Sequence, residues 1–400
     1  MKKNVFIISF LILAFAGLNL FGQEDKEKKD VYQFTMEKQV PVTSVKDQYR
    51  AGTCWSFSGI GFVEAELLRK GKGEYDLADL FIVRKAYEAK AEKYIRMHGE
   101  TNFGGGGAFH DVFYVMENYG IVPEEQYRGL EYGEDNHVHG ELDAVLKAYV
   151  DAVLKNKNKK LSTAWFKGLQ GILDAYLGEV PEHFTYNEKK YTPKSFAKEL
   201  DFNRNDYINF TSYTHHPFYK SFILEIPDNW LWGESYNLPI EDLITVMDNA
   251  ISNGYSIAWG ADVSEKGFKW SKGVAIVPAD DRPDLDGLER AKWEELSTKE
   301  KNELLYSFEK PLKEKDITQE MRQVAFDNYQ TTDDHGMLIS GIAKDQNGVK
   351  YYYVKNSWNT NNIYDGYFYA SESFVKYKTM NIVVHKSAIP KDILKKLGIK

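Results

Sequence analysis

The fold of this chain is decided by residues 41–57, which read PVTSVKDQYRAGTCWSF. This stretch holds Cys54, the only cysteine among 400 residues, six positions after Gln48. Apolar residues then recur at helical spacing, at positions 57, 60, 63, 67 and 68. The spacing predicts that Cys54 lies in the first turn of a helix. There, free backbone N–H groups and the helix dipole favour the thiolate, which is the nucleophilic form.

A lone cysteine also has a simpler interpretation, a small buried side chain that packs like a hydrophobe. Residues far downstream favour catalysis instead. His335 begins an apolar strand pattern, Asn347-Gly348 is a strong hairpin signal, and the returning strand ends at Asn356. A thiolate nucleophile needs a base, a group that orients the base and donors for the oxyanion. His335, Asn356 and the Gln48 amide with the Cys54 N–H could supply these three functions.

Composition predicts a well-packed globular protein. Hydrophobic residues make up 43% of the chain and aromatic residues 14%. The formal net charge is −8, which argues against nucleic acid or an anionic membrane surface as the main partner.

Residues 1–22 resemble a secretory signal peptide. Lys2 and Lys3 precede an apolar centre at residues 5–16, and cleavage is predicted before Gln23. The apolar run is shorter than the roughly 20 residues of a membrane-spanning helix, so an uncleaved anchor is the weaker alternative. We therefore expect an exported protein, periplasmic or secreted, without stable membrane insertion after cleavage. A single cysteine cannot form an internal disulfide there, which again favours catalysis.

The rest of the chain divides by pattern into a flexible lead-in (23–40), a helical region (41–130), a long middle segment (131–330), a β-rich region (331–386) and a tail (387–400). Helices are predicted at 77–97, 109–119, 141–154, 161–177, 239–253 and 390–397, with further starts at 191–196 and at a capping box, 297–300. Strands are predicted at 255–261, 350–355, 366–370 and 382–385.

Four consecutive glycines follow the second predicted helix, at 104–107. They predict unshielded backbone N–H and C=O groups that an extended peptide could pair with. A flexible surface loop is the alternative.

Two histidine pairs, His137 with His139 and His215 with His216, have metal-ligand character but no evident carboxylate or cysteine beside them. We predict surface histidines at both places and no metal site.

Gln48, Cys54-Trp55, His335 and Asn356-Ser357-Trp358, in this order, resemble the papain-like cysteine peptidases. Ala51 stands where that family's signature has its first cysteine, which removes a disulfide but no catalytic group. The resemblance implies an α+β, two-lobed fold, with the nucleophile on a helical lobe and the histidine and asparagine on a β-rich lobe. It also implies peptide hydrolysis through a Cys54 acyl-enzyme without a cofactor. The substrate contacts would lie at Gly106, Gly107 and Trp358.

Spacing narrows the resemblance to one branch. His335 follows Cys54 by 335 − 54 = 281 positions, against roughly 130–150 in papain, so a helix-rich insertion of about 130 residues is expected between them. The bleomycin hydrolase and aminopeptidase C branch has such an insertion. Five further stretches of this sequence resemble the same branch: 106–107, 119–123, 191–193, 239–263 and 333–335. The branch implies an aminopeptidase that acts on peptides, assembled as a hexamer, whose C-terminal arm enters the cleft.

The tail at 387–400 carries Lys391, Lys395, Lys396 and Lys400, which would repel the ammonium group of a substrate. We therefore expect a weakened arm, and cysteine endopeptidase action is the alternative to aminopeptidase action. A catalytically silent peptide-binding protein on the same scaffold is the third reading.

Overall fold

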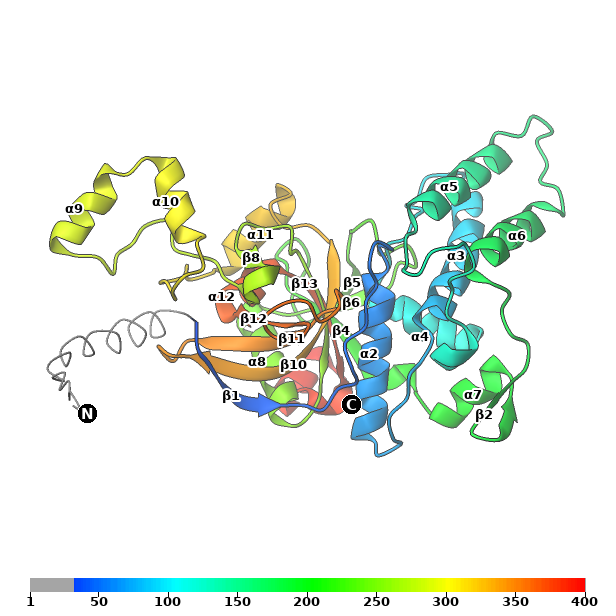
Figure 1. Cartoon of the computed structure of the whole chain (residues 1–400), viewed down its shortest axis with the longest axis horizontal. Coiled ribbons are helices and arrows are strands. Elements are labelled where there is room, and N and C mark those ends of the chain that lie inside the picture. Colours follow the sequence, from blue (N-terminus) through cyan, green and yellow to red (C-terminus); the bar gives the residue numbers. More distant parts are fainter. Residues whose placement is uncertain (1–31, 400) are drawn as a thin grey trace, which may run out of the picture.

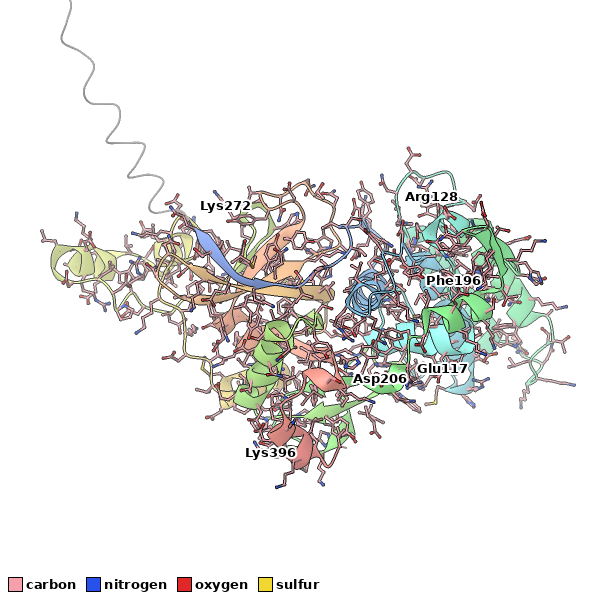
Figure 2. All side chains as sticks on the ribbon, turned by 90° about the horizontal axis from the view of Figure 1, so that it is seen from below. Glu117, Arg128, Phe196, Asp206, Lys272 and Lys396 are labelled. Atoms are coloured by element: carbon pink, nitrogen blue, oxygen red, sulfur yellow. The ribbon has the colours of Figure 1, made fainter. Side chains whose placement is uncertain are left out.

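The computed structural model describes residues 32–399. The predicted signal peptide and the lead-in as far as residue 31 lie outside them. The chain has an α+β fold in which one helix, α2 (Cys54–Arg69), stands between a group of helices and a large sheet (Figure 1). Every α2 residue from Trp55 to Leu67 is buried, because the helix is covered from both sides. The predicted helix start at Cys54 and the predicted fold class are confirmed.

The helical side packs around α2 in one continuous apolar core. Its helices are α3 (Asp79–Arg96), α4 (Phe109–Asn118), α5 (Gly140–Leu154), α6 (Trp165–Leu177) and α7 (Pro193–Leu200). A small hairpin, β2 (Phe184–Tyr186) with β3 (Lys189–Tyr191), precedes α7, which Thr192 caps through its side chain. The predicted helices are present here, each shifted by a few residues at its ends.

The other side is an eleven-stranded sheet in the order β5-β6-β4-β13-β7-β10-β11-β12-β9-β8, with β1 paired to β10. Its strands are β1 (Phe34–Gln39), β4 (Tyr207–Thr211), β5 (Ser221–Ile223), β6 (Glu234–Asn237), β7 (Ile257–Ala261), β8 (Phe268–Lys269), β9 (Val274–Ala275), β10 (His335–Asp345), β11 (Lys350–Lys355), β12 (Tyr367–Ser371) and β13 (Thr379–His385). The β10–β11 hairpin turns at Asn347-Gly348, as predicted, with Gly348 at φ 79°.

Four helices pack on the sheet in a second core: α8 (Ile240–Ser252), α11 (Gln319–Asp327), α12 (Glu372–Lys378) and α13 (Lys391–Leu397). Two more, α9 (Gly287–Glu295) and α10 (Thr298–Leu305), form an arm that projects from the body (Figure 1). The capping box predicted at Ser297 and Glu300 begins α10. Within residues 32–399, no helix combines the length and apolar character needed to cross a bilayer.

The long middle segment, 131–330, is shared between the two sides of the molecule. It supplies α5, α6 and α7 to the helical side, but it also supplies β7, which pairs with both β10 and β13 in the middle of the sheet. The β-rich side is thus completed by strands that precede residue 331 in the sequence.

A glycine allows the sheet to approach α2 closely. A Cβ on Gly336, the second residue of β10, would lie 2.8 Å from Ser58 Oγ and 3.3 Å from the Trp55 Cα. Because Gly336 has no side chain, β10 can meet the first turn of α2. This contact delivers His335 to the beginning of that helix.

Candidate active site

Cys54 occupies the first position of α2. Its N-cap residue, Thr53, makes no side-chain capping bond, so the first backbone N–H groups of the helix keep their hydrogen-bonding capacity. The N–H groups of Gly336 and Trp55 point to the Cys54 sulfur. Ser58 Oγ donates to the Cys54 carbonyl at 2.6 Å and fixes the backbone there.

The hairpin brings His335 and Asn356 together as predicted. His335 Nε2 lies 2.7 Å from Asn356 Oδ1, and the Ser357 N–H donates to the same oxygen at 2.8 Å. Because an amide oxygen only accepts, His335 carries its proton on Nε2 and has its lone pair on Nδ1. Trp358 covers the pair, with its ring centroid 4.6 Å from that of His335. The imidazole is therefore held in the tautomer that a general base requires.

Burial acts on both members of the proposed pair. It raises the pKa of the Cys54 thiol to about 12, although hydrogen bonds from the backbone N–H groups of Gly336 and Trp55 act to lower this pKa. It lowers the pKa of His335 to about 4, although the hydrogen bond with Asn356 acts to raise this pKa. The Trp55 N–H at the helix start lowers the Cys54 pKa in the predicted direction, but burial outweighs it. A thiolate and an imidazolium would favour each other's charge, so proton transfer from sulfur to imidazole would couple the ionisation of the proposed pair.

Gln48 is buried and oriented by Ser357. The Ser357 hydroxyl donates to Gln48 Oε1 at 2.6 Å, and the Gln48 backbone N–H donates to the Ser357 carbonyl at 2.9 Å. With its oxygen engaged, the Gln48 amide has its NH₂ group left for another acceptor. Gln48, Ser357, Asn356 and His335 thus form one continuous chain of hydrogen-bonded groups.

Cys54 and His335 line a common cavity of about 20 Å³, together with Gly107, Asp228 and Asp333. A space of this size holds about one water molecule. The cavity joins the beginning of α2 to the beginning of β10, and both carboxylates face it from segments outside these two elements.

The glycine loop is less open than its sequence predicts. Lys90 Nζ donates to the carbonyls of Gly104 and Gly106, and Trp55 Nε1 donates to that of Gly105 at 2.8 Å. The expectation of free carbonyl groups is wrong, because two side chains of the helical core reach the loop. Gly107 remains in the cavity wall, beside the Trp55 ring.

The prediction for the two histidine pairs holds in part. His137 and His139 are buried, at 9% and 0% exposure, because they pack among aromatic rings that include Phe57 and Tyr132, so the prediction of surface positions is wrong for them. His215 and His216 are at the surface, but both contact Glu225, at 3.1 and 2.9 Å. The chain folds back after β5 and brings this carboxylate, which is not evident from the sequence pattern.

Three residues at the site were not predicted to have a role. Ser357 and Asp333 adjoin the predicted Asn356 and His335 and stand in motifs that carry the family resemblance, which is the signal that could have pointed to them. Asp228 has no local signal.

Two family models match the chain. Residues 29–175 match the papain family cysteine protease model, and residues 300–399 match the Peptidase C1-like family model. The chain belongs to the papain-like cysteine peptidases. The two matches contain Cys54 and His335 respectively, so both members of the proposed pair lie in papain-family sequence.

Papain-family relatives extend along most of the chain. Aminopeptidase C of Listeria monocytogenes is 21% identical, with 93% of this chain and 86% of the relative covered. Aminopeptidase G of Lactobacillus delbrueckii subsp. lactis is 21% identical, with 88% and 83% covered. Bleomycin hydrolase of Rattus norvegicus is 23% identical, with 88% and 82% covered. The resemblance to the bleomycin hydrolase and aminopeptidase C branch is confirmed, and the chain is a cysteine peptidase.

The papain-like fold is also found by structural comparison. PepW from Lactobacillus rhamnosis HN001 superposes with a TM-score of 0.68 at 18% identity, over 93% of this chain and 86% of PepW. The middle segment of this chain therefore belongs to a fold shared by both proteins.

Proposed function

We propose that this cysteine peptidase is an aminopeptidase that acts on peptides. The observation that carries the peptidase chemistry is the hydrogen-bonded chain from Gln48 through Ser357 and Asn356 to His335, which ends at the Cys54 cavity. The relatives named aminopeptidase C and G support the exopeptidase assignment. The signal-like pattern of residues 1–22 supports export, and a homo-oligomer such as the hexamer implied by the branch belongs to the same proposal.

The proposed reaction is acyl transfer through Cys54. The Cys54 proton moves to His335 as the sulfur attacks the scissile carbonyl carbon, and the oxyanion accepts hydrogen bonds from the Cys54 N–H and the Gln48 NH₂. The carbonyl re-forms as the C–N bond breaks, and the leaving amine takes the proton from His335. Water then attacks the thioester with His335 as base, which releases the acid and restores the thiol.

Replacement of the nucleophile tests the proposal. In Cys54→Ala we expect hydrolysis of an aminoacyl coumarylamide to fall at least about 10⁴-fold, because no covalent intermediate forms. A thiol-reactive epoxide should label the wild type once and the variant not at all, since the chain has one cysteine. An unchanged melting temperature shows that the fold persists.

Serine at the same position is the matched control. Cys54→Ser keeps the size of the side chain but has a far weaker nucleophile, so we expect similar loss of activity. Wild-type activity in Cys54→Ala would overturn the proposal. Wild-type cleavage of amino-blocked peptides in their interior, as fast as of free ones, would favour the endopeptidase alternative.

A further inference from the structure

The loop between β5 and β6, residues 224–233, crosses from the sheet to the helical side. Trp230 anchors it there: the side chain is buried in the core around α2, and its Nε1 donates to Asp111 Oδ2 at 2.5 Å. The Asn229 amide ties the loop to itself, with bonds to the carbonyls of Leu224 and Gly233 at 3.0 and 2.9 Å. The residue before these anchors, Asp228, is therefore held in a fixed position.

Asp228 lies directly over the glycine loop. A Cβ on Gly106 would lie 2.2 and 2.3 Å from the two carboxylate oxygens, so the carboxylate rests where only a glycine leaves space. Asn102 Nδ2 donates to Asp228 Oδ1 at 3.0 Å. The carboxylate thus stands at the rim of the Cys54 cavity, next to Gly107 in its wall.

A second carboxylate, Asp333, faces the same cavity from the segment just before β10. Among the described residues, no side chain or backbone group donates a hydrogen bond to it. The pKa of Asp333 is raised to about 8, mainly because the carboxyl group is buried and secondly because Asp228 carries a like charge. A half-buried carboxyl group without a partner costs stability, which points to a ligand that brings donors and positive charge.

One lysine that acts on the Asp228 charge is already engaged. The Lys90 ammonium lies between the glycine loop and the rings of Trp55, Tyr87 and Trp230, and it donates to the carbonyls of Gly104 and Gly106. It compensates part of the Asp228 charge from below the loop. The cavity side of the carboxylate pair stays open to a second cation.

The covalent geometry of a peptide places such a cation here. In an amino-terminal residue, the ammonium nitrogen is two bonds, about 2.5 Å, from the carbonyl carbon. When that carbon meets the Cys54 sulfur, the ammonium group must lie in the same small cavity. An acylated amino group at this place would present a neutral N–H without the positive charge that the two carboxylates favour.

We propose that Asp228 and Asp333 form the receptor for the free α-ammonium group of a peptide, and that this pair confines cleavage to the amino-terminal residue. The inference rests on the proposed aminopeptidase function and identifies the residues that determine its specificity. Both carboxylates also raise the pKa of Cys54. A bound ammonium group offsets their charge, and it therefore favours ionisation of the nucleophile only when the correct substrate is present.

The test compares Asp228→Asn, Asp333→Asn and the double variant with the wild type. Each is assayed on two coumarylamides of the same amino acid, one with a free and one with an acetylated amino group. Glu234→Gln is the matched control, because it removes the same charge from an exposed residue at the start of β6, directly after the loop. Epoxide titration of Cys54 counts the folded sites in every preparation.

We expect each single variant to raise KM for the free substrate about tenfold, and the double variant to lower the kcat/KM ratio of free to acetylated substrate about 100-fold. The control should keep the wild-type ratio. If the wild type prefers the free substrate and the variants keep that preference, the inference is overturned while the proposed function stands. If the wild type cleaves both substrates equally well, the proposed function fails first.

Discussion

Two groups of polar side chains meet at the Cys54 cavity, and they differ in how fully they are hydrogen-bonded. In the first group, Gln48, Ser357, Asn356 and His335 bind one another at 2.6 to 2.8 Å. In the second group, Asp333 has no hydrogen-bond donor among the described residues. Asp228 has a single one, the amide of Asn102.

The difference separates groups that act on the reacting atoms from groups that await a ligand. In the first group, Gln48 Oε1 and Asn356 Oδ1 both accept hydrogen bonds, which fixes the orientation of each amide before substrate arrives, as an oxyanion donor and a group that orients a base require. Burial of carboxylates with few hydrogen-bond donors costs free energy, and a bound cationic group lowers that cost while they stay ionised. The first group therefore suits any peptide bond, whereas the second suits only the bond next to a free amino group.

A large effect on kcat should come from separating the two elements that hold the first group. In Gly336→Ala, the new Cβ collides with Ser58 Oγ and approaches the Trp55 backbone, so β10 must move away from α2. A displacement of a few tenths of an ångström between base and nucleophile should lower kcat about 100-fold. KM for the free coumarylamide should change little.

Gly171→Ala is the matched control, because a Cβ at this position on α6 meets no atom within 4 Å. It should keep full activity. Wild-type kcat in Gly336→Ala would show that the close approach of β10 does not set the geometry of the pair.

A smaller effect should come from loosening Gln48 while its side chain stays. Ser357→Ala removes the hydrogen bond to Gln48 Oε1, which is worth about 1 to 1.5 kcal/mol, so kcat should fall about tenfold. Gln48→Ala removes the oxyanion donor itself and should cost about 100-fold or more.

A double-mutant cycle shows whether Ser357 acts through Gln48. Addition of Ser357→Ala to Gln48→Ala should then have no further effect on kcat, since there is no amide left to orient. Two effects that simply multiply would contradict this positioning role.

The smallest expected effect is a change of KM with pH, and it tests the role of Asp333 in the second group. Asp333 faces Asp228, Asp334, His335 and Cys54, and its pKa of about 8 leaves it protonated at lower pH. A neutral carboxyl group cannot pair with an ammonium ion, so KM for the free coumarylamide should fall about fivefold between pH 6.5 and 8. Above this range KM should rise again as the substrate amine loses its proton.

Initial-rate measurements of KM against pH check this sign. In Asp333→Asn the fall between pH 6.5 and 8 should disappear, while the pH dependence of kcat, which belongs to the Cys54–His335 pair, should remain. The same slope of KM in the variant would assign the titration to another group.

The positions of Cys54, His335 and Asn356 within their helix and hairpin could be predicted, because local sequence patterns indicate these elements. Helical spacing after Cys54 places the nucleophile at a helix start, and a hairpin signal at Asn347-Gly348 brings His335 to Asn356. Both depend on contacts within one helix or one pair of strands. Periodicity and turn chemistry report such contacts directly.

Local patterns fail where a side chain meets a distant segment. The glycine loop looks open in sequence, but Lys90 and Trp55 occupy its carbonyl groups from the helical core. His137 and His139 look like surface residues, but neighbouring aromatic rings enclose them.

The sequence by itself predicted the helix start that carries Cys54 and the hairpin that brings His335 to Asn356, because each depends on contacts within one helix or one pair of strands. The tertiary structure alone decided that Asp228 lines the same cavity as Cys54 and His335. Asp228 lies 228 − 54 = 174 positions after Cys54, and it reaches the cavity only because Trp230 is buried in the helical core and bonded to Asp111. No local spacing encodes that contact, since it depends on how a loop from one side of the molecule packs into the other.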